Sequence, residues 1–129
     1  MAEHPNAALA RRALDGVDRG DSSAMVALLA DDIVWREMGR DEPIRGKDAV
    51  LARLAELGGV ADVRTKLHDV VANDEHGVAL VTARATRGGR TLTYRVAEIV
   101  HFRDGKVTER WAFSDDTERI VRFFADSPD

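Results

Sequence analysis

Apolar residues recur at two different spacings along the chain, and the change of spacing falls near the middle. In the first half they return every three or four positions, as at Leu9, Ala13 and Val17, which is the spacing of an amphipathic helix. A helical spacing returns in the last residues. The predicted helices are Asn6 to Asp18, a short one after the N-capping residues Ser22 and Ser23, about Lys47 to Leu57 with an end at Gly58-Gly59, and Thr117 to Phe124.

In the second half apolar and polar residues alternate, which is typical of strands with one exposed face. The predicted strands are Val63 to Val71, Val78 to Arg87, Thr91 to Phe102 and Val107 to Ser114, with an earlier one at Ile33 to Glu37. Residues 39–46 are predicted to be a loop. Helices interrupted by one strand, then an antiparallel meander and a short helix, indicate an α+β fold whose helices cover one face of a curved sheet.

Composition narrows the class of protein. The 129 residues, 44% of them hydrophobic and 33% charged, suit a single domain spanning 1–129 with a core at about 6–125. A net charge of −4 argues against nucleic-acid binding, and the absence of cysteine excludes disulfides and thiolate ligands. No apolar run approaches the ~18 residues of a membrane span, and no signal-peptide core is present. We expect a cytoplasmic protein without a cofactor, and the four histidines show no metal-ligand spacing.

The segments LLADDIVW, EPIRGKDAV and HFRDGKVTERWAFSDD, together with this order of elements, resemble the nuclear transport factor 2-like superfamily. The SnoaL-like and ketosteroid-isomerase-like branches are the most similar, and the resemblance covers about Asn6 to Ala125. It implies a cone-shaped fold in which the sheet and helices enclose one deep, mostly apolar pocket. Because the fold hosts isomerases, epoxide hydrolases, polyketide cyclases, dehydratases and non-catalytic binders, it does not identify the reaction.

The resemblance implies positions for acid–base chemistry. The carboxylate that moves the proton in ketosteroid isomerases falls on Glu37, and the second acid of those enzymes falls on Glu98. Their oxyanion-holding Tyr falls on Ala13, which cannot donate a hydrogen bond, so steroid isomerisation itself is not expected. The alternative for Glu37 is a solvated residue at the end of a strand, near Arg36 and Arg40.

A third acid, Asp115, matches a late-strand Asp that SnoaL-like cyclases use for acid–base work. The spacing Asp115-x-x-Glu118 is also that of a capping box, so the alternative is that Asp115 or Asp116 caps the last helix.

The hairpin at Asp104-Gly105 decides which side chains surround Glu98. A two-residue turn places Phe102 opposite Val107, and it sets Glu98 in one face with Tyr94, Val96, Val100, Trp111 and Phe113. Burial among such residues disfavours the charged form of an acid. A three-residue turn with a bulge would instead pair Glu98 with Arg110. We expect the two-residue turn, and with it a binding wall made of Trp35, Tyr94, Val96, Trp111 and Phe113.

Two functional hypotheses follow. The first is a cofactor-independent acid–base enzyme of isomerase, cyclase or hydrolase type, which acts with Glu37, Glu98 and Asp115 on an apolar carbonyl-bearing or cyclic ligand. The second is a non-catalytic module that binds such a ligand. We also predict a homodimer through the sheet face away from the pocket, with a monomer as the alternative. The residues predicted on that face are Ala79, Val81, Ala83, Ala85, Ala97, Ile99 and Ala112.

Overall fold

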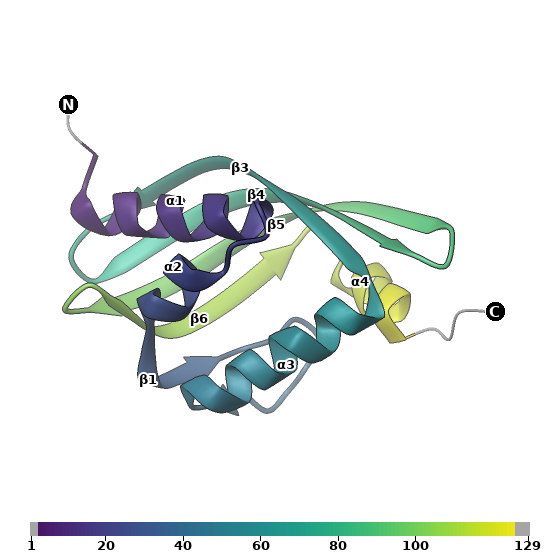
Figure 1. Cartoon of the computed structure of the whole chain (residues 1–129), viewed down its shortest axis with the longest axis horizontal. Helices are drawn as coiled ribbons and strands as arrows, with labels where there is room; N and C mark the ends of the chain where they lie inside the picture. The colour runs from purple at the N-terminus through teal and green to yellow at the C-terminus, as the bar shows by residue number, and fades with distance from the viewer. Residues whose placement is uncertain (1–2, 126–129) are drawn as a thin grey trace.

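Six strands form one curved sheet in the order β2-β1-β6-β5-β4-β3 (Figure 1). The structure is a computed structural model that describes residues 3–125, so the predicted domain ends beyond them lie outside the described residues. The strands are β1 (Leu29–Trp35), β2 (Ile44–Arg45), β3 (Asp62–Ala72), β4 (His76–Arg87), β5 (Arg90–Arg103) and β6 (Lys106–Ser114). The helices are α1 (Pro5–Asp18), α2 (Ser23–Leu28), α3 (Lys47–Val60) and α4 (Thr117–Ala125). The predicted α+β class is confirmed.

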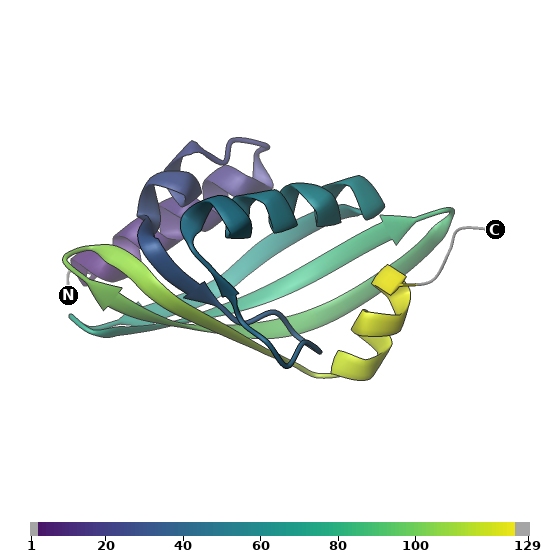
Figure 2. The ribbon, with the colours of Figure 1, turned by 90° about the horizontal axis from the view of Figure 1, so that it is seen from below.

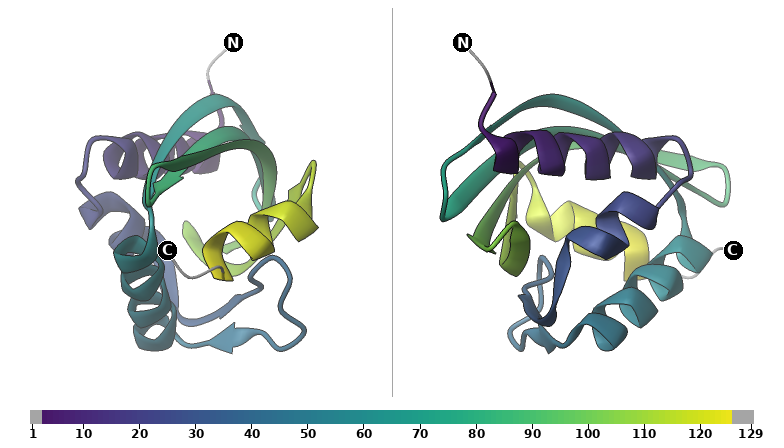
Figure 3. Two further views of the ribbon diagram at one scale, coloured as in Figure 1. Left: turned by 90° about the vertical axis from the view of Figure 1, so that its right-hand side faces the viewer. Right: turned by 60° about the vertical axis from the view of Figure 1, so that its left-hand side comes forward.

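All four helices lie over the concave side of the sheet, which we call the inner face; the other side is the outer face. Figure 2 shows α1, α2 and α3 on one side of the strands, and Figure 3 shows the sheet curling round the interior that the helices cover. Strands β3 to β6 form an antiparallel meander, while β1 pairs parallel with β6 and antiparallel with β2. Among residues 3–125, no helix combines the length and apolar character that crossing a membrane requires.

The ends of α1 and α4 follow from local chemistry. The ring of His4 accepts a hydrogen bond from the backbone N–H of Asn6 at 3.0 Å, and Pro5 occupies the first position of α1. At α4 the carboxylate of Asp116 accepts from the N–H of Arg119 at 3.1 Å. The helix-capping alternative therefore holds for Asp116 and not for Asp115.

Three local predictions are wrong. The first strand spans Leu29–Trp35 and not Ile33 to Glu37, so Glu37 lies after the strand. The third helix does not end at Gly58-Gly59 but continues to Val60, which packs on the core beneath α4. Tertiary packing outweighs the low helix propensity of glycine there. Residues 39–46 are not all loop, because Ile44 is buried and pairs with Trp35 as β2.

The core has two parts along the inner face. One lies beneath α1 and α2 and includes Leu29, Ile33 and Phe102. The other lies beneath α4, where Ile120 and Phe123 pack with Tyr94, Leu92 and neighbouring residues of the sheet. Helices α1 to α3 and helix α4 therefore cover different stretches of the same long strands.

The hairpin turn is as predicted, but the pairing beyond it is not. Phe102 pairs with Val107, and Asp104 and Gly105 have the positive φ angles of 53° and 76° that such turns require. A β-bulge at Thr108 then moves the register by one residue, so that Glu98 lies opposite Ala112 and not opposite Trp111. Trp111 and Phe113 therefore lie on the outer face, and their predicted place beside Glu98 is corrected.

The predicted dimer face needs a similar correction. Ala79 on β4 lies directly opposite Glu98 on β5, so Ala79, Val81, Ala83 and Ala85 are on the inner face, where all four are buried. Ala112 is also on the inner face. Of the residues predicted on the far side, Ala97 and Ile99 are there, paired with Phe113 and Trp111.

Candidate functional site

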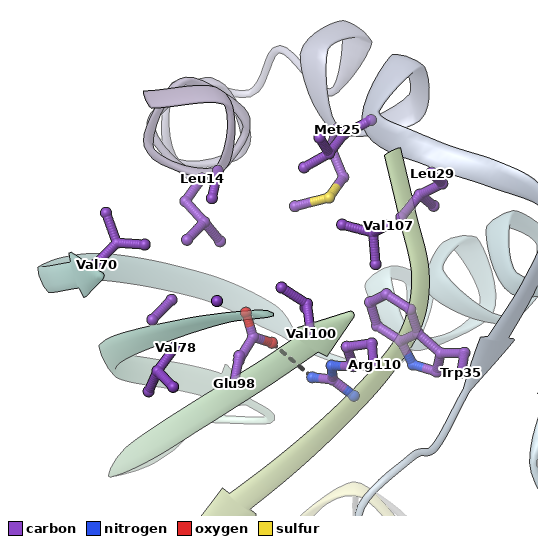
Figure 4. A pocket seen from close by; sticks show the side chains of 14 residues that line it. Leu14, Met25, Leu29, Trp35, Val70, Val78, Glu98, Val100, Val107 and Arg110 are labelled. Carbon is purple, nitrogen blue, oxygen red and sulfur yellow. Dashed lines mark hydrogen bonds and ion pairs between the residues drawn. The ribbon is translucent and has the colours of Figure 1, made fainter. Parts of the chain in front are cut away.

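A cavity of about 40 Å³ lies between α1, α2 and the inner face of the sheet (Figure 4). Its walls are mainly aliphatic: Leu14 and Met25 cover it from the helices, and Val100 and Val107 line it from the sheet. The charged residues among those that line it are Glu98 and Arg110, side by side on β5 and β6. The cavity is thus mostly apolar, with one ion pair in its wall.

The neighbours of Glu98 explain why its side chain reaches the cavity. The residues directly opposite it on the two flanking strands are both alanines, Ala79 on β4 and Ala112 on β6. Their short side chains leave room above the sheet, and the Glu98 side chain remains 22% exposed within it. Its Oε1 accepts a hydrogen bond of 2.6 Å from Nη2 of Arg110. Glu98 therefore has an arginine partner, in place of the aromatic surroundings that the two-residue turn predicted.

Arg110 is held on several sides. Its side chain is 11% exposed, and its guanidinium lies over the Trp35 ring at 4.1 Å from the ring centre. Its Nη1 donates to the carbonyl oxygen of Arg36 at 3.2 Å. Its Nε is buried and has no hydrogen-bond partner among the residues that the structure describes. The planar group is therefore fixed in orientation while its buried Nε–H remains unused.

Tyr94 lies on the inner face of β5, four residues before Glu98, but it belongs to the core beneath α4 and does not line the cavity. Burial raises the pKa of its phenol, and the negative charge of Glu98 adds to this while Arg110 opposes it. Val96 lies in the same core. Tyr94 is consequently a neutral phenol at neutral pH.

Glu37 lies outside the cavity, just after the end of β1. Its two carboxylate oxygens accept hydrogen bonds of 2.7 and 3.0 Å from Nε and Nη2 of Arg53 on α3. Arg53 also donates to Glu56 at 2.7 Å, and its hydrogen bonds to the Glu37 carboxylate are the main reason why the pKa of Arg53 is raised. The Glu37 carboxylate thus ties α3 to the loop after β1.

Asp115 is also outside the cavity. It lies with Tyr94, Asp116 and Arg119 around a separate polar hollow of about 210 Å³ between the start of β5 and α4. Its carboxylate accepts from the backbone N–H of Arg95 at 3.2 Å, which is the main cause of its lowered pKa. Within the part of the chain that is described, no group of three potential metal ligands is arranged to hold an ion.

The structure thus brings two of the predicted site residues, Trp35 and Glu98, to one cavity. Glu37, Asp115, Tyr94 and Val96 are not among the residues that line it, and Trp111 and Phe113 face the other side of the sheet. From the sequence, Arg110 is an alternative partner of Glu98 and not a predicted site residue. Its position next to Trp35 depends on the parallel pairing of β1 with β6, which places Trp35 opposite Arg110.

The fold agrees with what comparison with known proteins shows. The SnoaL-like domain family matches residues 10–110, and the chain belongs to this family. An uncharacterised protein of Mycobacterium tuberculosis is 29% identical over 131 residues, which span 97% of this chain and 100% of the relative. The predicted superfamily is therefore confirmed.

Solved structures show the same fold. A nuclear transport factor 2-like protein of unknown function from Burkholderia pseudomallei is 22% identical and superposes with a TM-score of 0.83, over 95% of this chain and 99% of that one. A putative SnoaL-like polyketide cyclase from Jannaschia is 13% identical with a TM-score of 0.79, over 97% of this chain and 95% of that one. At these identities the likeness establishes the fold alone.

Proposed function

We propose that this protein binds a small, mostly apolar, carbonyl-bearing or cyclic molecule in the cavity beneath α1 and α2, and that Glu98 exchanges a proton with it without a cofactor. The observation that carries the proposal is the Glu98–Arg110 pair in an otherwise apolar cavity. An apolar pocket with a few convergent polar groups is the usual form of a small-molecule site. Membership of a family with cyclase-type relatives supports the same class of activity.

The proposed step is a proton transfer at the carbon next to the ligand's carbonyl group. The carboxylate of Glu98 takes the proton, the electrons of the C–H bond form the C=C bond of an enolate, and the negative charge moves to the carbonyl oxygen. The protonated Glu98 then returns the proton to the same or another carbon, so the carboxylate is regenerated. Glu37 and Asp115 are engaged with Arg53 and Arg95 away from the cavity, so the step rests on Glu98.

The second candidate function is binding without catalysis. One observation favours it: Ala13, where the resemblance places the phenol of the isomerases, is fully buried and apolar. For either function, the cavity as it stands is small. Ordinary small-molecule sites measure about 300–1,000 Å³. A ligand of that size requires Leu14 and Met25 to move, and the flexible side chain of Met25 can do so at little cost.

A probe ketone separates the two functions. In D₂O, 2-indanone exchanges the hydrogens next to its carbonyl group for deuterium. Proton NMR measures the exchange as the loss of their signal, and amide spectra of the protein measure binding. An enzyme accelerates the exchange above the buffer rate, whereas a binding module shifts amide signals around the cavity without acceleration. Neither effect is expected if the cavity is not a site.

A matched pair of variants on α1 locates the effect. Leu14→Trp fills the cavity from the helix, and Val17→Trp places the same ring at a position that is 40% exposed. We expect Leu14→Trp to abolish binding and exchange and Val17→Trp to leave both unchanged. Equal behaviour of the two variants contradicts binding in this cavity.

We also propose a homodimer through the outer face, where two apolar rows cross the sheet. One row consists of Phe113, Ala97 and Leu80, and the other of Trp111, Ile99, Val78 and Val71. Phe113 is 59% exposed and Val71 60%, and a polar row with Glu109 and His101 borders them. A contiguous exposed apolar surface with a polar rim is typical of an interaction site.

Light scattering tests the dimer. One chain has a mass of 14.2 kDa, and we expect the wild-type protein at micromolar concentration to show about twice that mass. Phe113→Glu should return it to the mass of one chain, whereas Val17→Glu on α1 should not. A wild-type mass of one chain overturns the proposal.

A further inference from the structure

We infer that Arg110 selects the ligand of this cavity: its Nε–H donates a hydrogen bond to a neutral oxygen acceptor, such as a carbonyl oxygen. The inference rests on the proposed function, since it assumes that the cavity takes a ligand, and it goes beyond it by assigning the specificity-determining residue. Neither the predicted acids nor the predicted binding wall includes Arg110.

The hydrogen bonds of Arg110 show which donor is unused. Nη2 bonds Glu98 at 2.6 Å and Nη1 bonds the carbonyl of Arg36 at 3.2 Å, while one face of the group lies on Trp35. These contacts hold the guanidinium plane, and within the described residues Nε is left buried without an acceptor. A buried donor without a partner costs free energy. A ligand oxygen that accepts from this donor therefore gains more binding free energy than one that accepts from an exposed donor.

One other buried Nε has no partner in the described chain, and it serves as a comparison. That atom belongs to Arg87, whose Nη1 bonds the carbonyl oxygens of Phe123 and Phe124 at the end of α4. Arg87 lines neither of the two hollows described above. Arg110 is therefore the residue in which an unused buried donor coincides with a cavity wall.

The charges around the cavity indicate a neutral ligand. Glu98 balances the charge of Arg110, so the pair offers one acceptor and one donor but no net charge. A ligand carboxylate would meet the Glu98 carboxylate, and a ligand ammonium would meet Arg110. The aliphatic walls give no compensation for the lost hydration of either ion. A ketone, by contrast, places its oxygen on Nε–H and an adjacent C–H toward Glu98.

Three probes of one skeleton test the inference: 2-indanone, indane, and indane-2-carboxylate. Titrations are followed by amide NMR, and the Arg110 Nε–H has its own nitrogen-15 signal, identified by its loss in Arg110→Lys. We expect 2-indanone to bind about tenfold more tightly than indane, the factor that one hydrogen bond to a charged donor supplies. Indane-2-carboxylate should bind more weakly than 2-indanone. The Nε–H signal should move with 2-indanone and stay unchanged with indane.

Arg110→Lys keeps the charge near Glu98 but removes the Nε donor, so it should bind 2-indanone and indane with equal affinity. Arg53→Lys makes the same replacement outside the cavity and should keep the tenfold preference. If both probes bind wild-type protein equally and the Nε–H signal does not move, the inference fails while the cavity stands as a site. If none of the three probes binds, the proposed function fails and the inference with it. The wild-type signal gives this result even if Arg110→Lys does not fold.

Discussion

Two glutamate–arginine pairs occupy different regions of this molecule and show how position decides what an ion pair can do. Glu98 and Arg110 are 22% and 11% exposed, and Glu37 and Arg53 are 18% and 26% exposed. Both pairs have short hydrogen bonds. The first pair lines a cavity beneath two helices, whereas the second joins α3 to the loop after β1.

The two pairs differ in how completely the arginine uses the carboxylate. Arg53 takes both oxygens of Glu37, which leaves the carboxylate engaged on both sides. Arg110 bonds Oε1 of Glu98 with one of its nitrogens and leaves its own Nε without a partner in the described chain. A pair in which the arginine bonds both carboxylate oxygens holds elements of the fold together. A pair that leaves a donor without a partner beside a cavity can bind a ligand.

The largest difference is expected when each acid is neutralised. Glu98→Gln removes the proposed base and should lower the catalysed deuterium exchange of 2-indanone about a hundredfold, within the range for a lost general base. Glu37→Gln should leave the exchange rate within about a factor of two, since its side chain is outside the cavity. An equal loss in the two variants would remove the functional distinction between the pairs.

A smaller difference is expected in stability when each arginine is replaced by methionine. Arg110→Met leaves Glu98 unpaired and removes the stacking on Trp35, so urea unfolding should show a loss of about 2 kcal/mol. Arg53→Met removes the more exposed of the two arginines and should cost about 1 kcal/mol. A larger loss for Arg53→Met would contradict the view that Arg110 is the more deeply anchored of the two.

The smallest effect concerns a third, exposed pair, Asp115 and Arg95. Because the pKa of Asp115 is lowered in the folded chain, its contribution to stability is complete above its ordinary pKa of about 3.9 and is lost as the pH falls through the folded value. Asp115→Asn should therefore reduce the free energy of unfolding at pH 7, and this reduction should become smaller as the pH falls to 2. Asp116→Asn is the control, because asparagine also caps helices. A loss for Asp115→Asn that is the same at both pH values contradicts this origin.

Much of the fold is readable from the sequence because burial periodicity is a local property. The elements and their order follow from local spacing: the alternation along 78–87 and 91–102, and the helical spacing around Leu9 and Ala13. The turn at Asp104-Gly105 follows equally from its residue types. Confirmed features are thus those that one short segment determines by itself.

The site is less predictable because it depends on the relation between segments. One extra residue at Thr108 moves Trp111 and Phe113 to the outer face, and no local feature of the sequence marks that bulge. The parallel pairing of β1 with β6 brings Trp35 to Arg110, and these residues are far apart in the chain. The family resemblance indicates Glu98 as a candidate. That Ala79 and Ala112 flank it follows from the strand register, which the sequence does not show.

The central claim, that the ligand lies against Glu98 on the inner face, is tested most directly by intermolecular NOEs between 2-indanone and the methyl groups of the protein. The account predicts NOEs from the probe to Met25, Val100 and Val107, which line the cavity. NOEs confined to Leu80 and Ile99, beside Trp111 and Phe113 on the outer face, would contradict it.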